Sequence, residues 1–364
     1  MMDSKPTDLC CQPLFEDVAK EPLYIAGPCS AESREQLLAT ARGVAEAGVA
    51  VLRAGVWKPR TKPGSFEGIG SRALEWMAEA REVYGLKIIT EVATPEHLDL
   101  ALKTGVDGVW IGARTTTNPF ATQQIADALR GVDTAVIVKN PVIPDVDLWV
   151  GAIERIFNSG IRRLAAVHRG FGTHQTTPYR NAPHWSVPIE LHRRLPSLTI
   201  LSDPSHIGGS RDLIATLSQQ ALNLGFNGLM IECHPDPDAA LSDAAQQVTP
   251  ARLGEILAHL ELRRSPVAAD ALRDFRLHID SIDSRIVELL AERMDVAREI
   301  GEYKQQHGIA VVQQKRYNEL LTTAKLRAEA LGLSESFIYQ IFSQIHEQSV
   351  REQLRIEEEC KNKC

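Results

Sequence analysis

Two hydrophobic rhythms divide the chain near residue 262. Before this point, short apolar runs rich in β-branched residues alternate with longer segments whose apolar residues recur at helical spacing and mostly end in glycine. The eight apolar runs cover residues 24–28, 49–55, 87–92, 108–113, 135–140, 164–170, 199–204 and 228–235. Eight strands alternating with helices predict a (β/α)8 barrel, with an open doubly wound sheet as the alternative.

After residue 262 the strand-like runs cease. A helical pattern without proline runs from residue 268 to about 307, and further helical patterns follow at 315–331 and from 334 onward. We therefore expect an α/β barrel in residues 1–262, a linker at 263–269, an all-α three-helix domain at 270–358 and a tail at 359–364. A coiled-coil dimerisation arm is the alternative for so long a first helix.

Polar and reactive side chains stand at the carboxyl ends of the predicted strands. In a closed barrel all eight ends meet on one face, which is where barrel enzymes hold their active sites, whereas an open sheet would spread them along an edge. These residues are Cys29, Arg53, Glu91, Arg114, Lys139, His168, Arg169, Asp203, His206, Glu232 and His234.

Five cations belong to this face, and so many in one cleft repel each other unless an anion lies among them. Arginine forks suit phosphate and carboxylate, and lysine supplies a point charge. A solvated surface charge is the alternative for any single one. The five are Arg53, Lys58, Arg114, Lys139 and Arg169.

The stretch W-K-P-R-T-K-P at residues 57–63 adds to this picture. It places Lys58, Arg60 and Lys62 within five positions, and prolines directly after Lys58 and Lys62 restrict the backbone. We expect a stiff basic loop shaped around an anion.

A second group on the same face consists of Cys29, His206, Glu232 and Asp243. One thiolate with an imidazole and two carboxylates suits a divalent transition ion such as Mn, Fe, Co or Zn better than Mg. Taken singly, Cys29 reads as a small buried apolar residue and His206 as a core histidine. Cys233 should point to the opposite face of its strand and pack there.

Cations also interrupt the apolar stripe of the long C-terminal helix. Arg293 and Lys304 lie on that stripe roughly 16 Å apart, so their side chains can converge on one dianion. Arg276 lies roughly 25 Å before Arg293 and cannot reach the same pocket. We expect it to serve the pocket of an antiparallel partner chain, which predicts a helix-swapped homodimer and leaves a higher oligomer open.

Composition limits the remaining choices. A formal net charge of -7 argues against nucleic acid or an anionic membrane as the main partner. No apolar run is long enough to span a membrane, the first residues lack the apolar core of a signal peptide, and the six cysteines have no framework spacing. We expect a cytoplasmic protein with reduced thiols.

Seven short motifs resemble, in order, those of the metal-dependent 3-deoxy-D-arabino-heptulosonate 7-phosphate (DAHP) synthases. The resemblance covers nearly all of residues 20–262 and implies condensation of phosphoenolpyruvate with erythrose 4-phosphate, the first step of the shikimate pathway. The motifs are G-P-C-S (27–30), K-P-R-T (58–61), G-A-R-T (112–115), K-N-P (139–141), H-R-G (168–170), D-P-S-H (203–206) and E-C-H-P (232–235).

The resemblance also implies roles for individual residues. The five cations would hold phosphoenolpyruvate, and Arg60 and Thr61 would hold erythrose 4-phosphate. The group of Cys29, His206, Glu232 and Asp243 would bind the metal, with Mn²⁺ expected first and Fe²⁺, Co²⁺ or Zn²⁺ as alternatives. Lys58, Cys29 and His206 would take part in catalysis. The related octulosonate 8-phosphate synthases, which use arabinose 5-phosphate, are the competitor, although their loop resembles K-A-N-R-T/S.

Residues 272–354 resemble an all-α chorismate mutase, which needs no cofactor. The resemblance implies rearrangement of chorismate to prephenate, with Lys304 and Gln353 at the ether oxygen and the arginines at carboxylates or neighbouring groups. Gln313 and Tyr317 depart from better-known members, where carboxylates meet the substrate hydroxyl. The implied substrate-binding positions, of which Arg293, Lys304 and Gln353 would also be catalytic, are Arg276, Arg293, Lys304, Gln313, Arg316, Ser349 and Gln353.

The sequence therefore predicts a bifunctional enzyme of aromatic biosynthesis. The alternatives are a barrel synthase with a catalytically inactive dimerisation arm, or one whose arm acts only as a sensor. The fusion also suggests that prephenate or chorismate in the mutase pocket inhibits the synthase.

Overall fold

The computed structural model describes residues 9–18, 22–58, 64, 66–173, 176–262 and 269–361, the side chains of 269–271, 274 and 359–361 excepted. Arg60, Thr61 and the tip of the predicted basic loop lie outside these residues. The chain divides into two compact units, one up to residue 264 and one from residue 265.

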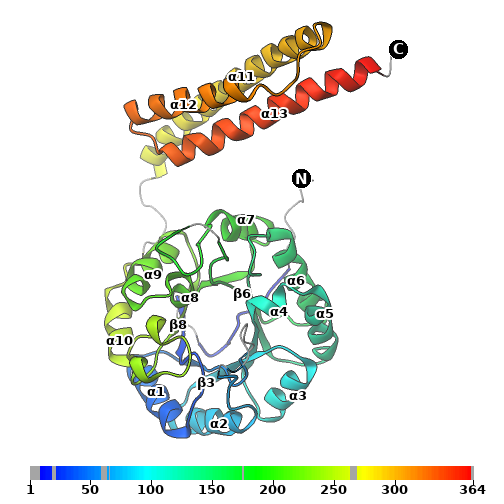
Figure 1. Cartoon of the computed structure of the whole chain (residues 1–364). Coiled ribbons are helices and arrows are strands. Elements are labelled where there is room, and N and C mark those ends of the chain that lie inside the picture. The colour runs from blue at the N-terminus through cyan, green and yellow to red at the C-terminus, as the bar shows by residue number, and fades with distance from the viewer. Residues whose placement is uncertain are drawn as a thin grey trace. The chain divides into compact units, whose positions relative to one another are not determined.

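The first unit is a closed parallel barrel of eight strands in sequential order, with β1 paired to β8 (Figure 1). Every strand expected from the apolar runs is present, and the prediction of a (β/α)8 barrel is confirmed. The strands are β1 (Leu23–Gly27), β2 (Val51–Arg53), β3 (Lys87–Val92), β4 (Gly108–Ile111), β5 (Ala135–Lys139), β6 (Leu164–His168), β7 (Thr199–Ser202) and β8 (Gly228–Glu232).

Helices form a ring outside the strands (Figure 1). Several begin at a residue whose side chain accepts a hydrogen bond from the first turn, such as Ser33, Thr94 and Asp145. The helices are α1 (Arg34–Glu46), α2 (Arg72–Tyr84), α3 (Pro95–Lys103), α4 (Ala113–Thr116), α5 (Pro119–Ala128), α6 (Val146–Asn158), α7 (Ser186–Arg194), α8 (Pro204–Gly208), α9 (Ile214–Asn223) and α10 (Pro250–His259), with 3₁₀ turns at Arg211–Leu213, Pro237–Ala239 and Ala244–Gln246.

Two apolar layers result from the alternation of side chains along each strand. One layer lies between strands and helices, and the other fills the barrel interior. Cys233 is fully buried in the outer layer, as expected. In several strands the interior apolar residue is followed two positions later by a charged one, so the charge faces the interior at the carboxyl end. The pairs are Val51 and Arg53, Ile89 and Glu91, Ile137 and Lys139, Val167 and Arg169, Leu201 and Asp203, and Met230 and Glu232.

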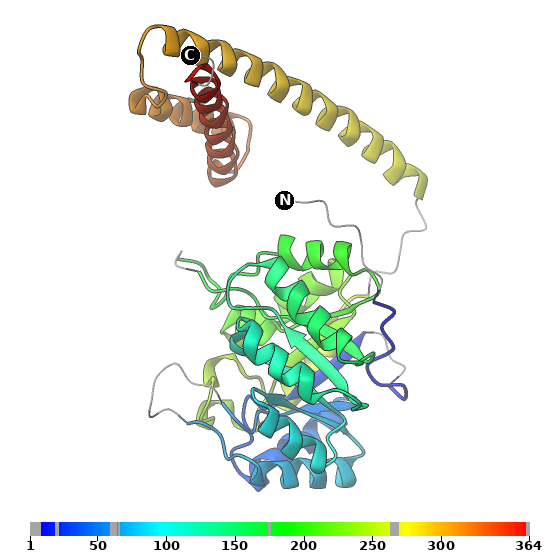
Figure 2. The same ribbon diagram turned by 90° about the vertical axis from the view of Figure 1, so that its right-hand side faces the viewer.

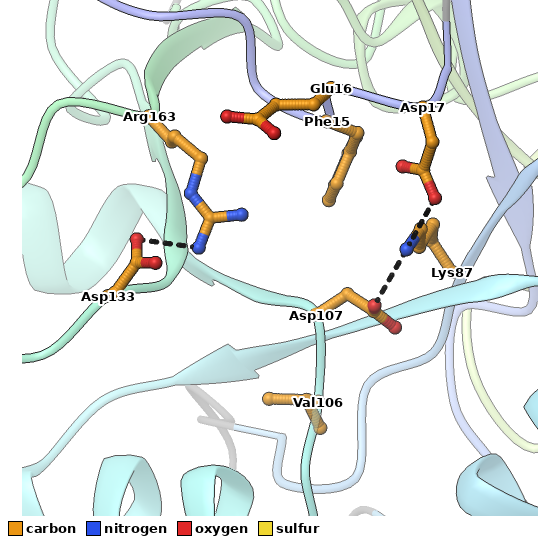
Figure 3. Close-up of a pocket in the computed structure, with 8 residues that line it drawn as sticks. All are labelled: Phe15, Glu16, Asp17, Lys87, Val106, Asp107, Asp133 and Arg163. Carbon is orange, nitrogen blue, oxygen red and sulfur yellow. Dashed lines mark hydrogen bonds and ion pairs between the residues drawn. The ribbon is translucent and has the colours of Figure 1, made fainter.

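The opposite end of the barrel is covered by the segment before β1, where Leu14 and Phe15 are buried in the interior layer. A hollow of about 420 Å³ lies there, and most of its charged side chains form ion pairs: Arg163 bonds Asp133 at 2.8 Å, and Lys87 meets Asp17 at 2.9 Å and Asp107 at 3.5 Å (Figure 3). None of the predicted site residues lines this hollow, and in barrels the amino-terminal face serves stability.

The second unit consists of α11 (Ala269–Gln306), α12 (Gln314–Ala330) and α13 (Glu335–Lys361), which confirms the all-α three-helix domain. The amino-terminal half of α11 extends beyond the other two helices (Figure 2). This half exposes apolar side chains such as Phe275, Ile279 and Ile286. None of the described helices combines the length and the apolarity needed to cross a membrane.

His168, at the end of β6, packs in the outer layer and not in the cleft. Its ring lies 5.0 Å from that of Trp185 and 5.7 Å from that of Phe171, and Nε2 bonds the carbonyl of Pro183 at 2.6 Å. Burial lowers the pKa of His168 to about 3, so the histidine is neutral in the folded chain.

This histidine should make the barrel sensitive to acid. Because its folded pKa lies below its unfolded pKa of about 6.5, the stabilisation is complete above pH 6.5 and falls by about 1.4 kcal/mol per pH unit below it. We expect His168→Gln to lose about 1.4 kcal/mol less unfolding free energy than the wild type between pH 7 and 5.5. Urea unfolding at both pH values measures this, and parallel losses in the two proteins would contradict it.

Candidate functional site

Several of the charged residues at the carboxyl ends of the strands line one cavity of about 90 Å³. The strand alternation described above brings them together, while Gly112 leaves room for Glu91, whose Oε1 lies 2.0 Å from where a Cβ would be. The lining residues are Lys58, Glu91, Gly112, Ala113, Arg114, Lys139, Arg169, Arg180, His206 and Asp243.

Arg169 is the most constrained cation of the cavity. Its backbone N–H donates to Asn140 Oδ1 at 2.6 Å, and its Nη1 donates to Asn181 Oδ1 at 2.7 Å. Burial, opposed by Asp203 but reinforced by repulsion from Arg180 and Arg114, lowers the pKa of Arg169 to about 10. A bound anion would relieve this repulsion.

Two of the five predicted cations already have carboxylate partners within the protein, which offset part of the positive charge of the group. Arg53 is 1% exposed, lies 3.0 Å from Glu232, and stacks over Trp110 at 4.8 Å. It is not among the residues that line the cavity. Lys139 donates to Asp203 at 2.8 Å. Arg114, Arg169 and Arg180 add further positive charge to the cavity, where Arg180 is paired with Asp243.

The predicted metal ligands also meet in this cleft. Single ligand atoms of Cys29, Glu232 and Asp243 lie within 4.8 Å of one another. His206 Nε2 lies 3.8 Å from Glu232 Oε1 and 3.9 Å from Asp243 Oδ2. All four residues come together as expected, drawn from the ends of β1 and β8, from α8 and from the loop after β8.

The arrangement fits a divalent ion. Asp203 Oδ2 lies 2.7 Å from His206 Nδ1, which leaves Nε2 to face the other ligands. Glu232 Oε1 is buried and has no hydrogen bond within the described residues, although Arg53 lies close to it. Burial, and then Glu232, raise the pKa of the Cys29 thiol to about 12, so a metal has to displace its proton. Asp243 has a left-handed φ of 49°, an uncommon conformation that aspartate tolerates.

Lys58 lies beside both the cations of the cavity and the predicted metal ligands. Its Nζ lies 3.2 Å from Cys29 Sγ, and its backbone N–H donates to Glu67 O at 2.8 Å, which joins the two sides of the loop after β2. Burial opposes its charge, but Cys29 and Glu91 raise its pKa, so the ammonium form persists.

Sequence reasoning missed Arg180. It donates to Asp243 Oδ1 at 3.0 Å and to Gln246 Oε1 at 2.5 Å, and it lines the cavity. Arg180 lies in the long connection between β6 and α7, away from any strand end, so no strand signal marked it. Asp203 was noted only as a strand-end residue, although it holds both Lys139 and His206.

The helical unit contains a cavity of about 460 Å³. Arg293 and Lys304 both line it, which confirms that the two cations converge. Arg293 donates to Ser349 Oγ at 2.6 Å, and Lys304 Nζ donates to Val311 O at 2.7 Å and Gln353 Oε1 at 3.2 Å. The polar lining residues are Arg293, Lys304, Gln313, Arg316, Tyr317, His346, Ser349 and Gln353.

Arg276 is exposed and does not line this cavity, consistent with the expectation that it cannot reach the pocket of its own chain. His346 was not predicted. Its ring stacks on that of Tyr317 with centroids 4.2 Å apart, and it lies three positions before Ser349, one helical turn that could have indicated it.

The fold and the cleft define a (β/α)8-barrel protein of the class that carries its chemistry at the carboxyl ends of the strands. Residues 18–265 match the family described as DAHP synthetase I. The chain belongs to this family.

Similar proteins have two different names. Over 224 residues the chain is 37% identical to a phospho-2-dehydro-3-deoxyheptonate aldolase of Thermotoga maritima, covering 62% of this chain and 64% of that protein. The chain thus spans slightly less than two thirds of this relative. A 2-dehydro-3-deoxyphosphooctonate aldolase of Nitratidesulfovibrio vulgaris is 29% identical over 267 residues, 68% of this chain and 93% of that protein.

Solved structures show the same barrel. A crystal structure of the DAHP synthase of Thermotoga maritima has a TM-score of 0.61 at 33% identity, covering 70% of this chain and 71% of that one. A truncated form of a Thermotoga maritima synthase has a TM-score of 0.57 at 32% identity, covering 65% and 83%.

The helical unit matches a different family. Residues 275–354 match chorismate mutase type II. Both families are families of enzymes, and the chain therefore combines two enzyme domains.

Proposed function

We propose that the barrel condenses phosphoenolpyruvate with erythrose 4-phosphate to give DAHP and phosphate. The observation that carries this proposal is the cleft in which Arg114, Arg169 and Arg180 crowd beside the ligand cluster of Cys29 and Asp243. One substrate is an enol phosphate with a carboxylate, and the other is a phosphorylated aldehyde. Both need cations, and the aldehyde needs an electrophilic activator.

Phosphoenolpyruvate belongs, in this proposal, with Lys58, Arg114, Lys139 and Arg169. Arg53 would hold Glu232 in place and would not contact the substrate, because its charge is paired with Glu232 and it does not line the cavity. Arg60 and Thr61 keep their proposed place at the phosphate of erythrose 4-phosphate on the basis of the K-P-R-T motif.

Cys29, His206, Glu232 and Asp243 would hold the divalent metal, proposed as Mn²⁺, which when bound polarises the aldehyde as a Lewis acid. The cations of the cleft orient the enol phosphate so that its C3 faces the aldehyde carbon, and they offset the repulsion between two anionic substrates. Such preorganisation lowers the barrier by several kcal/mol in favourable cases, roughly 7–11 at the upper end. As C3 bonds to the aldehyde carbon, the aldehyde oxygen takes up a proton. Water adds its oxygen to C2 and gives up a proton, and the C2–O bond to phosphate then breaks, which leaves the C2 ketone of DAHP and free phosphate.

Metal-stripped full-length protein tests the barrel proposal. It is incubated with phosphoenolpyruvate and either erythrose 4-phosphate or arabinose 5-phosphate, and phosphate release is followed as Mn²⁺ is added back. We expect metal-dependent release with the four-carbon sugar. Release only with arabinose 5-phosphate would instead make the barrel an octulosonate 8-phosphate synthase, and no release with either sugar would reject the proposal.

We propose further that the helical unit rearranges chorismate to prephenate. Lys304 and Gln353 lie 3.2 Å apart and would both hydrogen-bond the breaking ether oxygen, where negative charge develops. Arg293 and Arg316 would bind carboxylates, with Ser349 holding the Arg293 side chain in place. Gln313 lines the same cavity and would contact the substrate as a neutral group.

A homodimer is part of this proposal, with Arg276 of each chain completing the pocket of its partner. It is supported by the exposed apolar side chains along the first half of α11, including Leu272, Phe275 and Ile279. An unpaired helix face of this kind favours burial against a second copy.

Mixing two inactive variants tests the swapped pocket. Arg276→Ala and Arg293→Ala should each lack mutase turnover, but a mixed dimer would contain one intact pocket. Mixing the variants in equal amounts and allowing subunits to exchange should restore about a quarter of wild-type turnover. Arg293→Ala mixed with Lys304→Ala is the matched control, because both changes affect the same chain's half of the pocket and no intact pocket can form. Equal recovery in both mixtures, or none in the first, would contradict the swap.

Inhibition of the synthase by prephenate or chorismate bound to the helical unit is also proposed, on the basis of the fusion itself. Saturating prephenate should lower synthase turnover in the wild type and leave it unchanged in Arg293→Ala. Unchanged synthase kinetics in the wild type would reject this link.

We also propose a cytoplasmic location, which the free thiols of Cys29 and Cys233 favour.

A further inference from the structure

The cavity of the helical unit contains one group that the proposed rearrangement does not use, the imidazole of His346. On α13, His346 precedes Ser349 by three positions and Gln353 by seven, so the three residues share one face of the helix. All three line the cavity. His346 is therefore placed among the groups that would touch a ligand.

The charges that face this cavity from the neighbouring helices are all positive. Arg293 and Lys304 contribute from α11, and Arg316 contributes from α12, where Tyr317 covers the imidazole with its ring. None of the described residues that line the cavity carries a carboxylate. Burial, and then repulsion from Arg293 and Lys304, lower the pKa of His346, so the free protein keeps this imidazole neutral.

A dicarboxylate in the cavity would reverse this balance. It brings two negative charges to the cations that otherwise repel an imidazolium, and these negative charges favour the protonated ring. We propose that His346 is a substrate-contacting residue of this cavity and that it takes up a proton when a dicarboxylate binds. The inference rests on the proposed mutase function, since chorismate and prephenate are both dicarboxylates.

The direction of the pH effect follows from linkage. A group whose proton affinity is higher in the complex than in the free protein tightens binding as pH falls through the interval between the two pKa values. We therefore expect prephenate to bind a few-fold more tightly near pH 6 than at pH 8, with about tenfold as the limit for a difference of one pKa unit. A monocarboxylate of similar size would show a smaller effect.

Calorimetry with prephenate and the full-length chain tests this inference. Titrations at pH 6.5 in buffers of different ionisation enthalpy report the number of protons taken up per site. We expect uptake in the wild type, none in His346→Gln, and unchanged uptake in the control His307→Gln, whose exposed ring stacks on Tyr303 and does not line the cavity. His346→Asn serves as a second variant if the glutamine weakens the fold.

The outcomes separate the two proposals. Prephenate binding without proton uptake, or uptake that persists in His346→Gln and His346→Asn, would overturn the inference and leave the mutase function standing. No prephenate binding by the wild type would overturn both.

Discussion

Replacing Cys29 with alanine is expected to lower synthase turnover by on the order of a thousandfold and to abolish stoichiometric Mn²⁺ binding. The Lewis-acid contribution of a metal amounts to several kcal/mol, and each 1.36 kcal/mol is a tenfold change in rate. Cys29 Sγ lies within 4.8 Å of ligand atoms from Glu232 and Asp243, so its loss opens the site on one side. Turnover with saturating substrates and equilibrium dialysis with Mn²⁺ measure the two effects.

Cys233 supplies the matched control. It is buried to the same extent as Cys29, and burial raises the pKa of both thiols to about 12, but it faces the outer apolar layer. Cys233→Ala should keep turnover and metal binding close to wild type. If Cys29→Ala behaves like Cys233→Ala, then Cys29 is not a ligand and the metal assignment is wrong.

Replacing Arg293 with alanine should lower mutase kcat/KM by about a hundred- to a thousandfold and leave synthase turnover unchanged. Removing one partner of a buried charged pair costs roughly 2–5 kcal/mol, and Arg293 is a half-buried cation directed into the cavity by its bond to Ser349. Chorismate consumption and phosphate release, followed in the same preparation, separate the two activities.

Arg298 is the control for this change. It lies five residues further along α11, pairs with Asp295 and Glu352, and does not line the cavity. Arg298→Ala should therefore keep both activities. A wild-type chain that binds prephenate without converting chorismate would make the helical unit a sensor. A chain that does neither would make it a dimerisation arm.

The barrel was predictable because its strands are short runs rich in β-branched apolar residues. The charged residues of the cleft were predictable because they lie at the carboxyl ends of these runs. Lys139 and Glu232 end apolar runs. Because side chains alternate along a strand, each of them faces the same side as the interior residue two positions before it. The helical unit was predictable for a similar reason, since α11 continues without proline over its whole length.

Partnerships between side chains were less predictable. Arg53 and Glu232 come from strands that are separated by β1, and their 3.0 Å contact depends on closure of the barrel. Arg180 reaches the cleft from a loop, whose path no periodicity describes. His346 lies on α13 among many other polar residues. Its role could not be predicted because its neighbours, Tyr317 and the cations of α11, come from other helices.

The alternation of interior and exterior residues along the barrel strands also limits where the chain can gain or lose a residue. Six charged residues at the strand ends each lie two positions after an interior apolar residue, as Lys139 does after Ile137. Inserting or deleting one residue between the two would turn the charge toward the helices and leave it buried without its partner Asp203. We therefore expect insertions and deletions of single residues among related proteins to lie in the loops and not within the strands.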